Sequence, residues 1–154
     1  MHLVECYSDE NLLRALGIPG RDIRRMRGKG NVMRFLQRKV DGPCIALLDL
    51  DRNEAQPSDL KVFTRQSEEH GVSMYTWKEH RLIFLDDNLE DWLVRAVKRA
   101  GKRMNDFGLP DDVRALHAIE PKVGDSRFAK AISFLDEVHS PALLALRRFL
   151  ERVK

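Results

Sequence analysis

Short runs of apolar residues alternate with longer, helix-like segments along the first hundred positions of the chain. The run at 44–48 is apolar throughout, which is the pattern of a central strand buried on both faces. Other segments repeat their apolar residues every three or four positions, the spacing of an amphipathic helix. We therefore predict strands at 2–6, 44–48, 72–77 and 81–85, and helices at 8–16, 32–40, 57–70 and from 89 onward.

The breaks between these elements are marked by glycine, proline and capping residues. Ser8 is predicted to cap the first helix, and the segment 28–31 is predicted to be a tight turn before the second. Residues 22–27 are mostly basic and fit either a short edge strand or an irregular loop. Beyond Gly101 the pattern is helical, with helices predicted at 111–119, 126–138 and 140–153.

This order of elements predicts a single α/β domain, with a small, mostly parallel, Rossmann-like sheet, flanking helices and a helical C-terminal extension. We expect residues 1–100 to form the core and residues 101–154 to pack on the same domain. The last helix has a broad apolar face. That face fits either the core or an interface, so a homodimer or a protein partner bound through the C-terminal helices stays open.

Composition supports one globular domain, since the 154 residues are 43% hydrophobic and 33% charged. No apolar run approaches the roughly 18 residues that a membrane span needs, so we expect no membrane association. The N-terminal residues do not have the pattern of a secretory signal. The two cysteines, Cys6 and Cys44, have no metal-ligand spacing, and we expect reduced thiols in a cytoplasmic protein.

Positive charge is concentrated in one segment rather than spread evenly over the chain, whose net charge is +3. Arg24, Arg25, Arg27 and Lys29 lie in a stretch where Asp22 is the only acid. This run is either a solvated basic face or a set of contacts to nucleic-acid phosphates. No aromatic residue is interleaved with the run as a nucleic-acid stacking motif would require, so a single-strand stacking platform is not predicted.

Acidic residues follow two of the predicted strands, Glu5 after the first and Asp49 and Asp51 after the central one. Parallel strands share one carboxyl edge, where open α/β sheets bind their ligands. Residues i and i+2 of an extended chain point the same way, so both aspartates are expected to face one point. Three converging carboxylates predict a site for Mg²⁺ or Mn²⁺. The alternative is that all three are ordinary strand-end and turn residues.

Three motifs in this order resemble the Toprim family: Val4-Glu5 followed by Asp9, Gly28 to Val32, and Leu47 to Asp51. The resemblance covers roughly residues 2–85. It implies a Toprim-like α/β core in which Glu5 is the general acid/base or a metal ligand. It also implies that Asp49 and Asp51 hold Mg²⁺ and that Lys29 lies near the phosphate. The glycine that usually follows the family's glutamate is Cys6 here.

The function predicted from these features is Mg²⁺-dependent phosphodiester chemistry on nucleic acid by a nuclease-like Toprim protein. One alternative is a non-catalytic Toprim-like module that binds nucleic acid or a protein partner. A second is a phosphatase of haloacid-dehalogenase type, because Asp49-Leu50-Asp51 resembles the nucleophile pair of that family. Asp86, Asp87 and Glu90 open a helix and are either capping acids or a second group of metal ligands.

Overall fold

The computed structural model describes residues 1–38, 40–119 and 123–151 of the chain. Its elements, where η marks a 3-10 helix, are β1 (His2–Val4), α1 (Tyr7–Ala15), η1 (Gly20–Asp22), β2 (Ile23–Arg25), α2 (Lys29–Gln37), β3 (Ile45–Asp49), η2 (Ser58–Val62), β4 (Thr64–Glu69), β5 (Val72–Trp77), β6 (His80–Leu85), α3 (Leu89–Arg99), η3 (Met104–Phe107), α4 (Val113–Ala118), α5 (Ser126–Glu137) and α6 (Pro141–Leu150). Within those ranges, no helix has both the length and the apolar character to cross a membrane.

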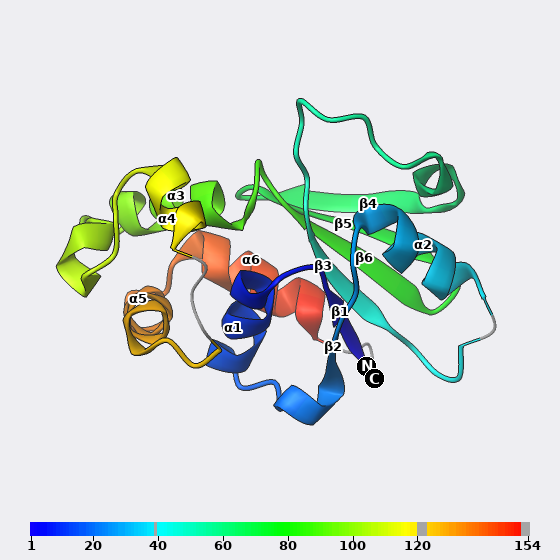
Figure 1. Cartoon of the computed structure of the whole chain (residues 1–154), viewed down its shortest axis with the longest axis horizontal. Coiled ribbons are helices and arrows are strands. Elements are labelled where there is room, and N and C mark those ends of the chain that lie inside the picture. Colours follow the sequence, from blue (N-terminus) through cyan, green and yellow to red (C-terminus); the bar gives the residue numbers. More distant parts are fainter. Residues whose placement is uncertain (39, 120–122, 152–154) are drawn as a thin grey trace.

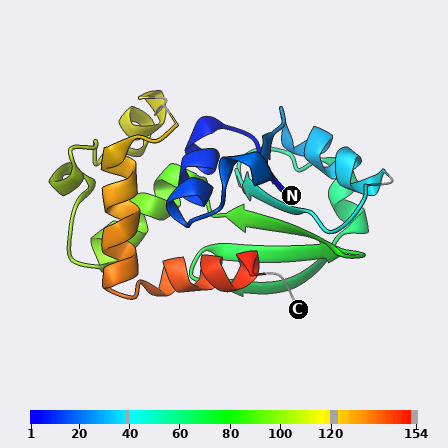
Figure 2. The ribbon, with the colours of Figure 1, turned by 90° about the horizontal axis from the view of Figure 1, so that it is seen from below.

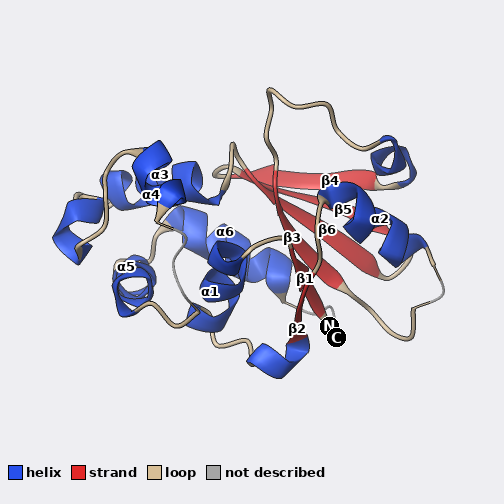
Figure 3. Cartoon of the chain, in the orientation of Figure 1, coloured by secondary structure: helices blue, strands red, loops and turns tan. Residues whose placement is uncertain are grey.

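The strands form one six-stranded mixed sheet in the order β2-β1-β3-β6-β5-β4 (Figures 1 and 3). Strands β2, β1, β3 and β6 pair in parallel, whereas β5 pairs antiparallel with both β6 and β4. The predicted α/β class is confirmed. The prediction of a mostly parallel sheet is confirmed only in part, because the β4–β5 hairpin extends the parallel half with antiparallel pairings.

The segment from Pro57 to His70 is not the helix that the sequence predicted. It forms η2 and then strand β4, which pairs with β5. His70 and Gly71 connect the two strands with φ angles of 49° and 76°. Two consecutive residues with positive φ form the hairpin turn whose twist matches paired strands. The glycine that looked like a helix stop therefore closes a hairpin.

Helices cover both faces of the sheet (Figures 1 and 2). On one face, Val4, Leu47 and Ile83 pack in a core shared with α1, α3, α5 and α6. On the other, Leu3 and Leu48 pack against α2 and the residues around η2. Neighbouring strand residues thus alternate between the faces, as the pleat of a strand requires. We call these two sides the α1 face and the α2 face.

The starts of the first two helices differ from those predicted. The N-cap of α1 is Cys6 rather than Ser8, which lies in the first turn of the helix. The 28–31 segment is not a separate tight turn, because α2 already begins at Lys29. Gly28 is its N-cap with a φ of 80°, a conformation that glycine adopts without strain.

The ambiguous basic segment 22–27 contains a strand. Residues Ile23–Arg25 form β2, which pairs in parallel with β1 at the edge of the sheet. At the other end of the chain, α4, α5 and α6 lie within the helices predicted there, and residues 152 and 153 of the last predicted helix fall outside the described residues. Leu143 and Leu146 of α6 are buried in the same core as the strands.

Candidate functional site

The ends of β1 and β3 bring the predicted acidic residues to one edge of the sheet. The two strands are parallel neighbours in which Val4 aligns with Leu47, so Glu5 leaves β1 beside the end of β3. Asp49 is the last residue of β3. We call Glu5, Asp49, Asp51 and the side chains around them the carboxylate edge.

Asp49 continues the alternation of β3 and lies on the α1 face, where α3 begins. Its Oδ1 accepts a hydrogen bond of 2.8 Å from the backbone N–H of Leu89, the first residue of α3. The pKa of Asp49 is raised to about 8, mainly by burial and also by the nearby carboxylates of Asp9 and Glu90. The hydrogen bond from Leu89 opposes this rise but does not cancel it. Asp49 is therefore a half-buried carboxyl whose pKa lies well above its ordinary value.

Asp9 and Glu90 are two buried carboxyls beside Asp49. Asp9 Oδ2 accepts hydrogen bonds of 3.2 Å from the backbone N–H groups of Glu5 and Cys6, while its Oδ1 has no partner. Burial raises the pKa of Asp9 to about 7. Glu90 is also buried, with Oε1 3.2 Å from Nδ1 of His117 and no partner on Oε2.

Asp51 lies in a different environment from Asp49. The extended backbone ends at Asp49, and Asp51 has a φ of 50°. The expectation that both aspartates point the same way needs an extended chain through Asp51, and this turn removes that condition. Asp51 Oδ2 instead accepts a hydrogen bond of 3.0 Å from the ammonium group of Lys29.

Lys29 is held by three oxygen atoms of the loop that follows β3. Besides the Asp51 carboxylate, its Nζ donates to the backbone carbonyls of Asp49 and Leu50, each at 3.1 Å. The Lys29 side chain is only 8% exposed. All three ammonium hydrogens thus have acceptors, and Lys29 is placed to fix the loop that carries Asp51 rather than to reach outward.

Glu5 completes this second group on the α2 face. Burial raises the pKa of Glu5, an effect that the positive charge of Lys29 opposes and the carboxylate of Asp51 reinforces. The carboxylate edge therefore has two halves. Asp49, Asp9 and Glu90 form the half on the α1 face, and Glu5, Asp51 and Lys29 form the half on the α2 face.

The residues at this edge fit a divalent cation in their chemistry, because carboxylate oxygens are the ligands that Mg²⁺ prefers. Crowded carboxyls with raised pKa values and an unpartnered buried oxygen on Asp9 are features that a cation would relieve. As the side chains lie, however, the described part of the chain has no group of three His, Cys, Asp or Glu residues arranged to hold a metal ion.

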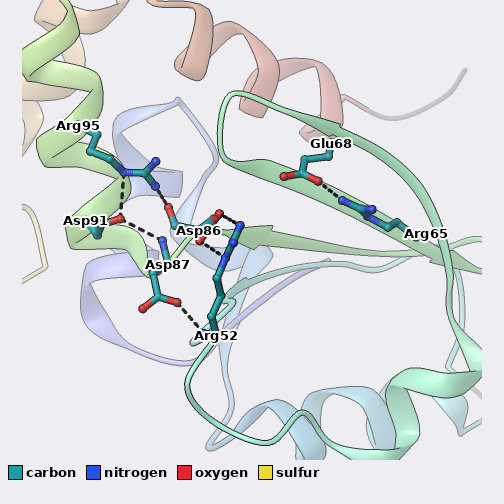
Figure 4. Close-up of polar contacts among 7 residues, drawn as sticks. All are labelled: Arg52, Arg65, Glu68, Asp86, Asp87, Asp91 and Arg95. Carbon is teal, nitrogen blue, oxygen red and sulfur yellow. Dashed lines mark hydrogen bonds and ion pairs between the residues drawn. The ribbon is translucent and has the colours of Figure 1, made fainter.

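The acids at the start of α3 are engaged with arginines and backbone groups (Figure 4). Arg52 pairs with Asp86, and the backbone N–H of Arg52 donates to Oδ1 of Asp87 at 2.6 Å. Asp91 accepts from the backbone N–H of Asp87 at 3.1 Å and pairs with Arg95 at 3.0 Å. The carboxylates of Asp86 and Asp87 thus accept from Arg52 and do not cap α3, whose N-cap is Asn88, with its side chain accepting from the N–H of Asp91. Glu90 is the exception, since it is turned into the carboxylate edge.

The basic segment lines a groove of about 360 Å³ between β2 and α2. We call it the arginine groove and define it by Arg24, Arg25, Arg27, Arg34 and Arg38. Among the described residues, no carboxylate forms an ion pair with Arg24, Arg27, Arg34 or Arg38. Lys29 belongs to the same basic segment but points into the carboxylate edge instead.

The sequence interpretation did not assign Arg34 or Arg38 to the site, and it named Glu90 only as an alternative, in the second group of metal ligands. Arg34 and Arg38 are four positions apart, which is the spacing of residues on one face of a helix. This spacing, directly after the basic segment, is the sequence signal that could have assigned them to the site. Comparison with protein-family models, with curated proteins and with solved structures finds no match to this chain.

Proposed function

We propose that this protein carries out divalent-metal-dependent phosphodiester chemistry on nucleic acid, as a nuclease-like Toprim protein. The observation that carries the proposal is that Glu5, Asp49 and Asp51 all lie at the carboxyl ends of β1 and β3, Asp49 in the half on the α1 face and Glu5 and Asp51 in the half on the α2 face. The arginine groove beside the edge strand β2 supports a polyanionic substrate, because four of its five arginines form no ion pair with a carboxylate of the described residues.

Each residue of the carboxylate edge has a role in this proposal. A bound Mg²⁺ or Mn²⁺ supplies neutralisation of the developing phosphate charge and activation of the attacking water. Glu5, Asp49 and Asp51 would hold it. Burial raises the pKa of Glu5 above its ordinary value, which favours a role for this carboxyl in proton transfer. Lys29 acts as a positioning residue that fixes the Asp49–Asp51 loop.

The second candidate function is a non-catalytic module that binds nucleic acid through the arginine groove. The specific observation that favours it is the Lys29–Asp51 ion pair, because an ammonium group already neutralises one proposed metal ligand. The lack of a formed three-residue group in the described chain agrees with it. Both candidates share the basic groove and differ only in the carboxylate edge.

Calorimetric titration with Mn²⁺ separates the two candidates. The variant is Asp49→Asn, which removes the ionisable carboxyl but keeps an oxygen that can accept from the N–H of Leu89. The matched control is Asp22→Asn. Asp22 is exposed and directly precedes β2, so it lies at the amino ends of the parallel strands, away from the carboxylate edge. The proposal expects saturable binding that Asp49→Asn abolishes and Asp22→Asn keeps. Absence of binding in the wild type, also with an oligonucleotide present, selects the non-catalytic module.

A further inference from the structure

Tyr7 is an exposed aromatic residue at the border of the carboxylate edge. It is the first residue of α1, two positions after Glu5, and it is 48% exposed. The guanidinium carbon of Arg25 lies 3.7 Å from the centroid of the Tyr7 ring. An aromatic ring this exposed, in contact with a guanidinium group, provides a flat surface that a second ring can extend.

Arg25 joins this aromatic surface to the arginine groove. Its Nε lies 3.4 Å from a carboxylate oxygen of Glu10, which fixes the guanidinium beside Tyr7, yet the side chain remains 40% exposed. Arg25 also lines the groove between β2 and α2. Arg25 therefore connects the arginine groove to Tyr7, and Glu5 lies two residues before Tyr7 in the chain.

The charge of the groove defines what the surface can accept. Arg24 lies over the Phe35 ring at 5.0 Å, and none of Arg24, Arg27, Arg34 and Arg38 forms an ion pair with a carboxylate within the described ranges. Several guanidinium groups without counter-charges on one small surface favour a ligand with several regularly spaced negative charges. A polynucleotide backbone has this property.

We infer that the ligand is a single-stranded nucleic acid, with an unpaired base stacked on the Tyr7–Arg25 pair and phosphates along the arginine groove. The inference deepens the proposed function and rests on it, because the bound strand would continue to Glu5. Only an unpaired base exposes its π-face to a protein side chain, whereas a duplex keeps its bases stacked on one another. The platform thus adds affinity for single strands alone.

The test measures binding without metal, in EDTA, by fluorescence anisotropy of labelled oligonucleotides. The probes are a single-stranded DNA, an RNA of the same sequence, the matching duplex and a DNA strand with abasic sites. The variants are Tyr7→Ala and Tyr7→Phe, and the second keeps the ring and serves as the matched control. Circular dichroism verifies that both variants are folded.

We expect Tyr7→Ala to weaken binding of base-containing single strands by roughly 5- to 100-fold. Tyr7→Phe should bind them like the wild type, and the abasic strand and the duplex should bind equally to all three proteins. The DNA and RNA arms identify which of the two nucleic acids binds more tightly.

Three results would overturn the inference: a Tyr7→Ala loss as large on the abasic strand as on the base-containing one, a duplex bound as tightly as the single strand, or no binding of either. A failure of the proposed function can be told apart from a failure of this inference. If the protein binds no metal but still binds single strands in EDTA, the proposed chemistry is wrong and the inference stands.

Discussion

The carboxylate edge and the arginine groove lie side by side but differ in whether their cationic side chains form ion pairs. At and beside the carboxylate edge the cationic groups are paired, Lys29 with Asp51 and Arg52 with Asp86. In the groove, Arg24, Arg27, Arg34 and Arg38 have no carboxylate partner among the described residues. Paired charges fix the geometry of the edge, whereas unpaired charges leave a field that attracts an anion.

Removing the buried cation of the carboxylate edge has the largest expected effect on stability. Lys29→Met deletes a nearly buried ammonium group and leaves the Asp51 carboxylate and the Asp49 carbonyl without this donor, while the Leu50 carbonyl keeps its bond from Gln56 Nε2. We expect the free energy of unfolding to fall by about 3–5 kcal/mol, measured by urea denaturation. Arg38→Met, at the groove, is the control and should cost less than about 0.5 kcal/mol. A loss under about 1 kcal/mol for Lys29→Met would contradict the interpretation that Lys29 fixes the loop after β3.

The raised pKa of Asp49 predicts a pH dependence of stability. Above about pH 4 the unfolded chain has released this proton, while the folded protein keeps it up to about pH 8. The folded state binds more protons in this window, so stability falls as the pH rises through it. Asp49→Asn should flatten that slope and exceed the wild type at pH 9 by more than about 1 kcal/mol.

Urea denaturation at a series of pH values measures this slope, with Asp22→Asn as the control that should keep it. An unchanged slope in Asp49→Asn would show that the Asp49 carboxyl is ionised in the folded protein.

Neutralising the groove should change binding and not stability. For the combined variant Arg24→Ala/Arg27→Ala/Arg34→Ala we expect weaker binding of single-stranded oligonucleotides and a smaller dependence of the affinity on salt. The slope of log K against log salt should fall by about one for each arginine that contacts a phosphate. Anisotropy titrations at several salt concentrations measure this slope. A slope identical to that of the wild type would exclude the groove as the binding surface.

The exposed ion pairs provide the smallest expected effect. Arg65 and Glu68 pair on β4 (Figure 4). This strand forms the opposite edge of the sheet from β2. Arg65→Ala should change the free energy of unfolding by about 0–1 kcal/mol and leave oligonucleotide affinity unchanged. Loss of affinity in this variant would mean that any arginine of the surface contributes, and the contrast between the two regions would disappear.

The sequence predicted the elements whose pattern is local. The apolar run at 44–48 predicted the buried strand β3, because a strand that is buried on both faces is apolar at every position. The spacing of apolar residues predicted α3 and α5, because a helix that is buried on one face repeats its apolar residues every three or four positions. The segment 57–70 failed because η2 and β4 are largely exposed. Its polar residues therefore have no clear period, and the hairpin depends on the turn geometry of His70 and Gly71.

The acidic residues of the site were predicted for the same reason, since strand order alone places Glu5 beside the end of β3. Their separation into two halves was not, because it depends on the positive φ of Asp51 and on contacts with α2 and α3. The Tyr7–Arg25 contact joins residues far apart in the sequence through the β1–β2 pairing. No local pattern reports such a contact.

Cleavage of a labelled single-stranded oligonucleotide tests the central claim most directly, with the wild type compared with Glu5→Gln in Mg²⁺ and in Mn²⁺. The account predicts that the wild type cleaves, that EDTA stops cleavage, and that Glu5→Gln binds the strand normally but does not cleave it. Equal cleavage by both proteins, or a wild type that binds the strand and never cleaves it at saturating metal, would contradict the claim.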